Sequence, residues 1–371
     1  MAEISVIIPV YNEIKFIQKT LESVVGDADE IILSDNASTD GTSDICQDFA
    51  NKYHEIKYTR HKENMGSAKN FLFAADRASG KYIRSIGAHD MSSIGSNRRM
   101  ASLLDNNPDV VMVYPKHIIG LKNDYSFNYF HDFSEFGNDL MSDQASIRIG
   151  SMITNLREFS IFFGLWRRDV FMNCINTRIF QSVATDHTIL STTAAKGKML
   201  ADDKSIFFRM YQYDEKKINN KENRFVKAIF GQENENIHDG YYYFAIIAEQ
   251  YEMLIELFGK NSSITAELFD FLLSRFSFEF DESESILDNL PPIIPGKKEF
   301  CQEIIASIKQ KHTENKKSNN KRSGSVKFRN GIKKIFKYVL PYGLYAILKL
   351  IYNKMDESAK KCKKIEGNKE P

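Results

Sequence analysis

The sequence ISVIIPVYNE at residues 4–13 decides the fold. Its first part, 4–10, is mostly apolar and β-branched, and the polar Tyr-Asn-Glu that follows marks the end of the run. An apolar run of this kind is typical of a strand that is buried on both faces. Residues 14–25 then carry apolar side chains at helical spacing. A buried strand followed by a helix predicts a parallel sheet that is joined by right-handed crossovers.

The alternation of strand-like and helix-like stretches continues to residue 115. Four more strand-like runs are separated by turn residues and helical patterns, at 30–34, 55–59, 81–86 and 109–115. Strands that alternate with helices are typical of βαβ units. We therefore expect residues 1–115 to form an open α/β sheet, Rossmann-like and mostly parallel, that is flanked by helices.

The rest of the chain is less regular. Residues 116–160 are rich in aromatic side chains and irregular, so we expect long loops there, and 159–208 mixes strand and helix signals. Between about 219 and 311, apolar residues recur at helical spacing, which predicts a mostly helical extension. Residues 313–330 are polar and basic, as in a linker.

The composition is that of an ordinary soluble globular protein, with 42% apolar and 27% charged residues in a chain of 371. The formal net charge of +1 conceals an asymmetry, because the chain from Lys309 onward holds 18 basic and 5 acidic residues. An acidic body with a basic tail predicts a tail that contacts an anionic surface, and a solvated, disordered tail is the alternative.

The tail also carries an amphipathic pattern. Apolar residues of 332–351 fall near one helical face among lysines, which is typical of a helix that lies in a membrane interface. A helix that packs on the core is the alternative, because Pro341 interrupts the pattern. No nucleic-acid-binding motif accompanies the basic residues, so we expect no nucleic-acid partner.

Cysteine usage and the first residues bear on the compartment. The four cysteines are far apart and form no Cys-x-x-Cys pair. This argues against a disulfide framework or a thiolate zinc site and indicates a reducing compartment. No basic segment precedes the first strand, so we expect no secretory signal. Lysines and a proline interrupt the apolar stretch at 332–352, which makes it a poor membrane-spanning helix.

Polar side chains follow the predicted strands at their carboxyl ends. Tyr11, Asn12 and Glu13 follow the first strand, Asp35 ends the second, and Asp90 follows the fourth. Ligands bind beyond the carboxyl ends of parallel strands, and carboxylates gathered there are costly unless a cation or a ligand neutralises them. The pattern therefore predicts a divalent cation with a diphosphate ligand, and oxygen ligands suit Mg²⁺ or Mn²⁺.

Four successive segments resemble the motifs of family 2 glycosyltransferases with the GT-A fold. They are SVIIPVYNE, SDNASTDGT, ENMGSAKN and SGKYIRSIGAHD, at 5–13, 34–42, 63–70 and 79–90. Any one of them alone is a weak signal, but four in order with family-like spacing are a strong one. The resemblance covers about 3–115 closely and 160–210 less closely. It implies a GT-A fold, Rossmann-like and mostly parallel, with a mostly helical C-terminal extension.

The resemblance implies a nucleotide-sugar donor site. Pro9 and Tyr11 would line the base pocket, with Glu13 beside them in the donor loop. Asp35 would accept a hydrogen bond from the base. Lys69, where the family often has Arg, would lie near the donor pyrophosphate, and its ammonium is a point charge rather than a fork.

The resemblance also implies a metal site on the donor diphosphate. Asp90 would be the last carboxylate of the family's Asp-x-Asp motif and would ligate the cation. The segment Gly87-Ala88-His89-Asp90 lacks the first Asp, and His89 stands beside Asp90. Imidazole tolerates Mn²⁺ better than Mg²⁺, so we expect Mn²⁺ or Mg²⁺ with some preference for Mn²⁺.

The weaker part of the resemblance implies the acceptor and catalytic residues. Asp186 would be the general base that takes the proton of the acceptor hydroxyl. A helix N-terminus lowers a carboxylate pKa, so a base in this position needs desolvation or crowding by other carboxylates. Trp166, the only tryptophan, would stack on an acceptor sugar. Arg209 would help to hold the leaving diphosphate.

Each assignment has a structural alternative. Acidic residues at helix starts often only cap the helix, a tryptophan often packs in the core, a single histidine is more often structural, and isolated basic residues are often solvated. Capping is thus the alternative for Asp35 and Asp186, and core packing is the alternative for Trp166. A structural role is the alternative for His89, and solvation is the alternative for Lys69 and Arg209.

With these roles the chain divides into segments. We predict a GT-A domain at 1–215, in which 1–115 binds the nucleotide sugar and 116–215 binds the acceptor. The remaining segments are a helical extension, a basic linker and a basic amphipathic tail, at 216–312, 313–330 and 331–371.

The function that we predict is inverting transfer of a sugar, of the hexosyl type and metal-dependent. The donor would be a nucleotide-diphosphate sugar, UDP-linked by first choice, and the acceptor a glycan, lipid-linked, in bacterial surface polysaccharide (O-antigen or capsule) synthesis. The enzyme would be cytoplasmic and peripheral to the inner face of the cell membrane. One alternative is a nucleotidyltransferase, which would need a Gly-rich phosphate loop where PVYNE stands. The other is a non-catalytic nucleotide-sugar-binding or scaffold protein.

Overall fold

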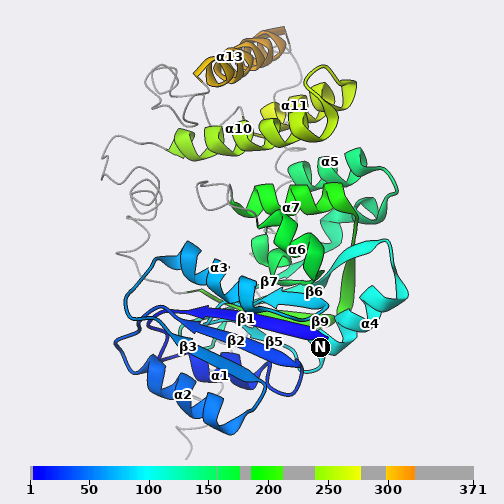
Figure 1. Cartoon of the computed structure of the whole chain (residues 1–371). Coiled ribbons are helices and arrows are strands. Elements are labelled where there is room, and N and C mark those ends of the chain that lie inside the picture. The colour runs from blue at the N-terminus through cyan, green and yellow to red at the C-terminus, as the bar shows by residue number, and fades with distance from the viewer. Residues whose placement is uncertain (1–2, 157, 176–184, 212–238, 277–297, 322–371) are drawn as a thin grey trace, which may run out of the picture. The chain divides into compact units, whose positions relative to one another are not determined.

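The computed structural model describes residues 3–156, 158–175, 185–211, 239–276 and 298–321 (Figure 1). One compact unit spans Met1–Ile308, and a second unit begins at Lys309. The predicted tail at 331–371, and the part of the predicted linker after residue 321, lie outside the described residues.

The first four strands form the parallel sheet that the sequence predicts. They are ordered β3-β2-β1-β4, with bounds Ile4–Val10 for β1, Glu30–Asp35 for β2, Ile56–Arg60 for β3 and Tyr82–Ser85 for β4. Helix α3 (Ser67–Arg77) lies on one side of these strands, and α1 (Ile17–Glu22) and α2 (Thr42–Lys52) lie on the other (Figure 1). Because β1 is central and covered on both faces, its apolar run is almost fully buried.

The second half of the sheet is mixed. The order continues β4-β8-β6-β9-β5, with bounds Met91–Ser92 for β5, Val110–Lys122 for β6, Leu165–Arg167 for β8 and Lys198–Tyr211 for β9. Strand β8 is inserted between β4 and β6 and runs antiparallel to both, whereas β6 and β9 are parallel. Strand β6 runs through residues 115 and 116, so the two predicted halves of the domain share a strand.

The expectation of long loops over 116–160 is wrong. Strand β6 continues to Lys122 and forms a hairpin with β7 (Phe127–Asp132). Two 3₁₀ turns, Phe133–Phe136 and Asp139–Met141, lead to helix α5 (Ala145–Asn155). The hairpin forms because β-branched and aromatic residues stand on both sides of a polar turn, which is a strand signal in spite of its irregular period.

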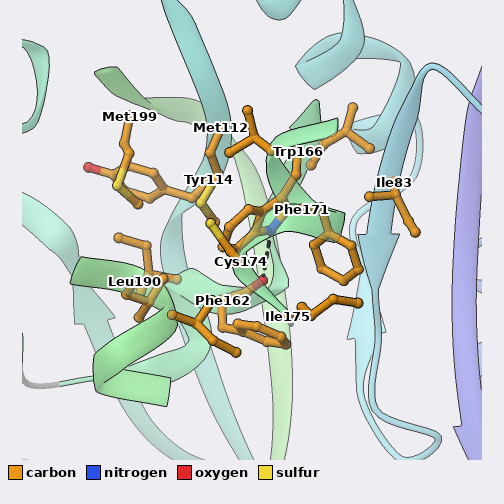
Figure 2. Close-up of a cluster of buried hydrophobic side chains, with 14 of the residues drawn as sticks. Ile83, Met112, Tyr114, Phe162, Trp166, Phe171, Cys174, Ile175, Leu190 and Met199 are labelled. Carbon is orange, nitrogen blue, oxygen red and sulfur yellow. Dashed lines mark hydrogen bonds between the residues drawn. The ribbon is translucent and has the colours of Figure 1, made fainter. Parts of the chain in front are cut away.

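Trp166 on β8 lies in the centre of the core (Figure 2). It has no exposed surface, and its indole nitrogen donates to the carbonyl of Phe162 at 3.2 Å. The rings of Phe162 and Phe171 approach it edge-on, with centroids at 5.8 and 5.4 Å. The prediction that Trp166 stacks on an acceptor sugar is therefore wrong, because neighbouring side chains cover the ring.

The extension is helical, as predicted. Its described helices are α10 (Asp239–Phe258), α11 (Ser263–Phe276) and α13 (Lys298–Lys321). Helix α13 continues to Lys321, so residues 313–321 are helical rather than linker. In the described part of the chain, no helix combines the length and the apolar character that crossing a membrane requires.

Two contacts join the extension to helices of the first domain. Helix α10 packs on α7 (Thr185–Lys196), where the Ser191 hydroxyl donates to Oε1 of Gln250 at 3.2 Å. The Arg275 guanidinium of α11 donates to the carbonyls of Ile153 and Leu156 at the end of α5. A cation at a helix C-terminus binds carbonyls that have no partner within the helix.

We predict that Arg275→Ala lowers the free energy of unfolding by about 1.5–3 kcal/mol, since two carbonyls lose a charged donor. Urea denaturation measures the loss. The matched control is Lys260→Ala, which breaks an exposed 2.7 Å ion pair with Glu303 and should cost less than about 1 kcal/mol. An Arg275→Ala variant no less stable than the control would contradict the prediction.

Candidate functional site

The loops that follow β1 and β2 are locked together by hydrogen bonds. The Asn12 backbone N–H donates to the Ser38 hydroxyl at 3.0 Å, and the Asn12 side chain accepts from the Thr39 N–H at 2.8 Å. The Glu13 N–H donates to the Thr42 hydroxyl at 2.8 Å. Asn12 has a positive φ of 55°, which asparagine tolerates better than most residues. The two loops thus present one polar edge at the carboxyl ends of the strands.

Asp35 lies buried beneath this edge. It accepts the Ser38 N–H at 2.8 Å and the hydroxyls of Ser43 and Tyr58. Burial raises the pKa of Asp35, but the hydrogen bonds from Ser38, Ser43 and Tyr58 outweigh it and hold the pKa below its ordinary value. Asp35 is therefore an ionised carboxylate that orders the loop, and its predicted contact with a base stays a prediction.

The other predicted donor residues lie around the same edge. Pro9 is half-buried on β1, and Tyr11 directly after it is 45% exposed. Lys69 is exposed in the first turn of α3, which begins beyond the carboxyl end of β3. These placements are compatible with contact to one ligand, which stays a prediction.

Asp90 lies in the short loop that joins β4 to β5, beside β9. It is 2% exposed, and its Oδ1 accepts the Met210 N–H of β9 at 2.9 Å. Within the described residues its Oδ2 accepts no hydrogen bond. A Cβ at Gly87 would lie 2.6 Å from this Oδ2, so a larger residue there would displace the Asp90 carboxylate. Burial raises the pKa of Asp90, and the nearby charges of His89 and Arg209 oppose the rise only in part.

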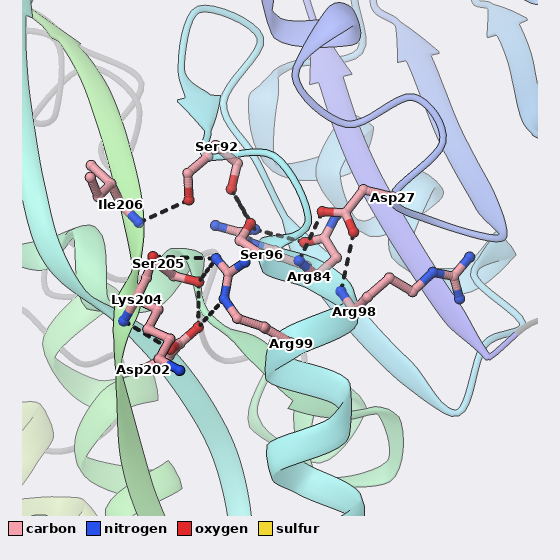
Figure 3. Close-up of polar contacts among 12 residues, drawn as sticks. Asp27, Arg84, Ser92, Ser96, Arg98, Arg99, Asp202, Lys204, Ser205 and Ile206 are labelled. Carbon is pink, nitrogen blue, oxygen red and sulfur yellow. Dashed lines mark hydrogen bonds and ion pairs between the residues drawn. The ribbon is translucent and has the colours of Figure 1, made fainter.

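The loop that carries Asp90 is anchored on both sides (Figure 3). Arg84 of β4 donates to the Ser92 hydroxyl at 2.8 Å. Ser93 and Ile206 of β9 exchange two hydrogen bonds, at 2.9 and 3.0 Å. Asp90 thus belongs to a loop fixed by strands on either side.

His89 connects this loop to the first one. Its Nδ1 lies 3.0 Å from Oε1 of Glu13. Burial lowers the pKa of His89, but the hydrogen bond that it donates to Glu13 and the charges of Asp90 and Glu13 raise it above the ordinary value. Because Nδ1 is taken up by Glu13, the predicted contact of His89 with the donor stays a prediction.

Arg209 on β9 stands among three carboxylates. It forms an ion pair with Glu158 and donates to the Ser160 hydroxyl at 3.2 Å. Its positive charge also lowers the pKa values of Asp90 and Asp186 relative to what burial alone would give. A single guanidinium therefore acts on residues from three separate segments of the chain.

Asp186 is the second residue of α7. Its side chain is open to solvent, yet the surrounding protein removes enough hydration to raise its pKa, and Arg209 only partly opposes this effect. The two observations agree when protein surrounds the carboxylate on most sides and leaves one approach for a ligand. The direction of the shift is the one that a general base near a helix N-terminus requires.

The described residues offer no ready-made metal cage. In those parts of the chain, no group of three or more His, Cys, Asp or Glu side chains could hold a metal ion. Asp90 alone fits a cation that takes most of its ligands from phosphate and water, which is how Mg²⁺ often binds.

Comparison with known sequences identifies the family. The family model described as glycosyl transferase family 2 matches residues 5–162. Residues 5–162 thus form a glycosyltransferase family 2 domain. The match includes the loops that carry Tyr11, Asp35 and Asp90 and also the Glu158 segment.

Two curated family members illustrate the range of the match. Abequosyltransferase RfbV of Salmonella typhimurium is 33% identical over 115 residues, which is 29% of this chain and 34% of RfbV. A protein of Bacillus subtilis named as a teichuronic acid biosynthesis glycosyltransferase, TuaG, is 36% identical over 90 residues, 24% of this chain and 36% of TuaG. The chain thus matches about a third of the length of each relative.

Solved structures share the fold. The structure of S. aureus TarS 1–349 in complex with UDP-GlcNAc aligns with a TM-score of 0.50 and 15% sequence identity, over 78% of this chain and 76% of that one. A second TarS structure aligns with a TM-score of 0.51 and covers 80% of this chain and 46% of its own. At this identity the likeness shows the GT-A fold alone.

Glu158 is the site residue that the sequence interpretation missed. Its side chain accepts the Ser160 N–H at 3.0 Å, so it caps the 3₁₀ helix Phe159–Phe163. The local pattern could have suggested such a cap. Its pairing with Arg209, 51 residues away, has no local signal.

We predict that Arg209→Gln raises the pKa of Asp186 further, because it removes the positive charge that opposes the rise. Carbon-13 NMR of Asp-labelled protein measures the titration, and Asp186→Asn assigns the signal. The control is Arg60→Gln, which removes a charge beside Asp35 instead and should leave Asp186 unchanged. A fall in the Asp186 pKa of the Arg209→Gln protein would contradict the arrangement.

Proposed function

We propose that the chain is an inverting, metal-assisted glycosyltransferase that uses a nucleotide-diphosphate sugar, with UDP the first nucleotide to test. The observation that carries the proposal is the grouping of Asp90 and Asp186 around Arg209 in a chain with a domain of this family. Inverting transfer needs a base for the acceptor hydroxyl and positive charge for the leaving diphosphate. Asp186 and Arg209 supply these two groups.

The donor would bind along the edge formed by the loops after β1 and β2. The exposed ring of Tyr11 offers an apolar face to a base, with Pro9 beside it. Asp35 would accept a hydrogen bond from the base. Glu13 and His89 lie on the same side, and Lys69 would meet the pyrophosphate from α3. The complex of TarS with UDP-GlcNAc makes UDP the first choice of nucleotide.

A divalent cation, Mn²⁺ or Mg²⁺, fits Asp90. The carboxylate has one oxygen without a hydrogen bond in the described structure, and burial raises its pKa. A bound cation would neutralise this carboxylate and the charge that develops on the leaving diphosphate.

The acceptor would be a glycan hydroxyl, lipid-linked, in surface-polysaccharide synthesis. The name of TuaG, which refers to teichuronic acid biosynthesis, supports this context. We propose hexosyl transfer at the inner face of the cell membrane, with the basic residues from Lys309 onward facing anionic lipid. With Trp166 buried, the acceptor platform has to come from other residues.

We predict that the protein binds one of UDP, GDP and TDP in the presence of Mn²⁺ and loses this binding after chelation. Isothermal titration measures it. Asp90→Ala should abolish binding, and Gly87→Ala should weaken it at least tenfold because its methyl displaces Asp90.

The matched control for Gly87→Ala is Gly150→Ala. Gly150 lies in α5, where a Cβ meets one Leu268 methyl at 3.2 Å. This variant should bind nucleotide as the wild type does. Absence of binding to all three nucleotides would overturn the donor assignment and favour a scaffold role.

We predict that Asp186→Asn lowers turnover by about 10²–10⁴-fold, the usual contribution of a general base, and leaves nucleotide affinity within about twofold. Steady-state kinetics with the nucleotide sugar found by binding measures both. Because the base must be deprotonated and its pKa is raised, wild-type activity should rise with pH above the ordinary aspartate range. Asp203→Asn, at an exposed position on β9, should be unaffected. Full turnover by Asp186→Asn would remove this residue from the mechanism.

A further inference from the structure

A row of three residues crosses the sheet next to the proposed site. Gly120 of β6 pairs with Tyr129 of β7 on one side and with Arg209 of β9 on the other. Residues directly opposite one another on neighbouring strands project to the same face of a sheet. Tyr129 and Arg209 therefore rise from the same face, separated only by a residue that has no side chain.

Gly120 is what allows Tyr129 to lean across this row. A Cβ at Gly120 would lie 1.9 and 2.0 Å from two ring atoms of Tyr129, so the ring covers the Gly120 backbone directly. From this position the Tyr129 hydroxyl donates to Oε2 of Glu158 at 2.7 Å. Any larger residue at 120 would push the ring away from Glu158.

Both oxygens of Glu158 have protein partners. Oε2 accepts from Tyr129, and Oε1 accepts from the N–H and hydroxyl of Ser160, at 3.0 and 2.8 Å, and from Arg209. Glu158 is only 7% exposed. A carboxylate that is buried and hydrogen-bonded at both oxygens has no room to contact a substrate. The role left for Glu158 is to hold the Arg209 guanidinium.

We infer that Glu158, braced by Tyr129 over Gly120, is a positioning residue that orients the Arg209 guanidinium toward the diphosphate of the donor. The inference rests on the proposed function, which places a diphosphate beside Arg209. The charge of Arg209 also acts on Asp90 and Asp186. Without Glu158 the guanidinium is free to pair with either of them, and binding a diphosphate would then require it to be ordered first.

The test is a double-mutant cycle on nucleotide affinity. Glu158→Gln keeps the size of the side chain and removes the charge that holds Arg209, so Kd for UDP with Mn²⁺, or for whichever nucleotide the wild type binds, should rise on the order of 10- to 100-fold, as for other supporting shells. Tyr129→Phe, which removes one hydrogen bond, should raise Kd about two- to tenfold. In an Arg209→Gln background neither change should matter further, because their effects run through Arg209.

Two controls separate positioning from folding. Tyr125→Phe removes another hydroxyl of the same hairpin, one that donates to the Lys15 carbonyl at 3.3 Å, and should leave Kd unchanged. Thermal unfolding of every variant checks that it is folded. If Glu158→Gln fails to fold, Tyr129→Phe and Gly120→Ala carry the test, since both disturb the same support.

A second measurement needs no nucleotide. The Arg209 Nε–H signal in nitrogen-15 NMR, assigned through Arg209→Gln, should be single and slowly exchanging in the wild type and averaged in Glu158→Gln. Any one of three results would overturn the inference alone. The folded Glu158→Gln protein could bind nucleotide as the wild type does, the effects of Glu158→Gln and Arg209→Gln on Kd could be additive, or the Arg209 signal could be the same in Glu158→Gln as in the wild type. Failure of the wild type to bind any nucleotide would overturn the proposed function and, with it, the role toward the diphosphate.

Discussion

The site depends on the hydrogen bonds that the buried guanidinium of Arg84 donates (Figure 3). Its Nε donates to the carbonyl of Phe163 at 2.7 Å, and its Nη1 donates to Ser92, Ser96 and Asn97. A buried charge is costly unless hydrogen bonds satisfy it. The acceptors on these residues therefore gather around the Arg84 side chain.

Two of the partners of Arg84 belong to the segments that carry the site. Ser92 ends the loop that holds Asp90, and Phe163 ends the 3₁₀ helix that Glu158 caps. Burial lowers the pKa of Arg84 to about 9 against the nearby charges of Asp27 and Asp202, which leaves it charged at neutral pH. One side chain in the middle of β4 therefore fixes the spacing of two acidic residues that are far apart in sequence.

The carboxylates of the site differ in how they are compensated, and this difference separates their roles. Glu158 has a lowered pKa, because Arg209, Tyr129 and Ser160 outweigh the effect of burial. Asp90 and Asp186 have raised pKa values, because loss of hydration dominates at both. Environments that shift the pKa values of like groups in opposite directions indicate distinct chemical roles. This difference supports the proposals above, in which Glu158 positions Arg209, Asp90 binds a cation and Asp186 takes a proton.

What the sequence could predict was whatever depends on local pattern. Strands β1 to β4 and the polar residues at their ends follow from runs of a few residues, and these place Asp90 correctly in a loop at the sheet edge. The insertion of β8 could not be read locally, because it depends on pairing of Trp166 with Ile83 and Met112 far away in the chain. The same insertion buries Trp166, which a local interpretation leaves available to a sugar.

The helical extension also supports the site through residues that are distant in sequence. Arg275 binds the carbonyls of Ile153 and Leu156 immediately before the Glu158 segment, and α10 packs along the helix that begins with Asp186. Helices α10 and α11 thus support, from outside the sheet, the segments of Glu158, which pairs with Arg209, and of Asp186, whose pKa Arg209 lowers. The loops after β1 and β2 are held by the sheet, whereas the segments of Glu158 and Asp186 are held by the extension. A change in the extension can therefore alter the surroundings of Arg209 and Asp186 without altering those loops.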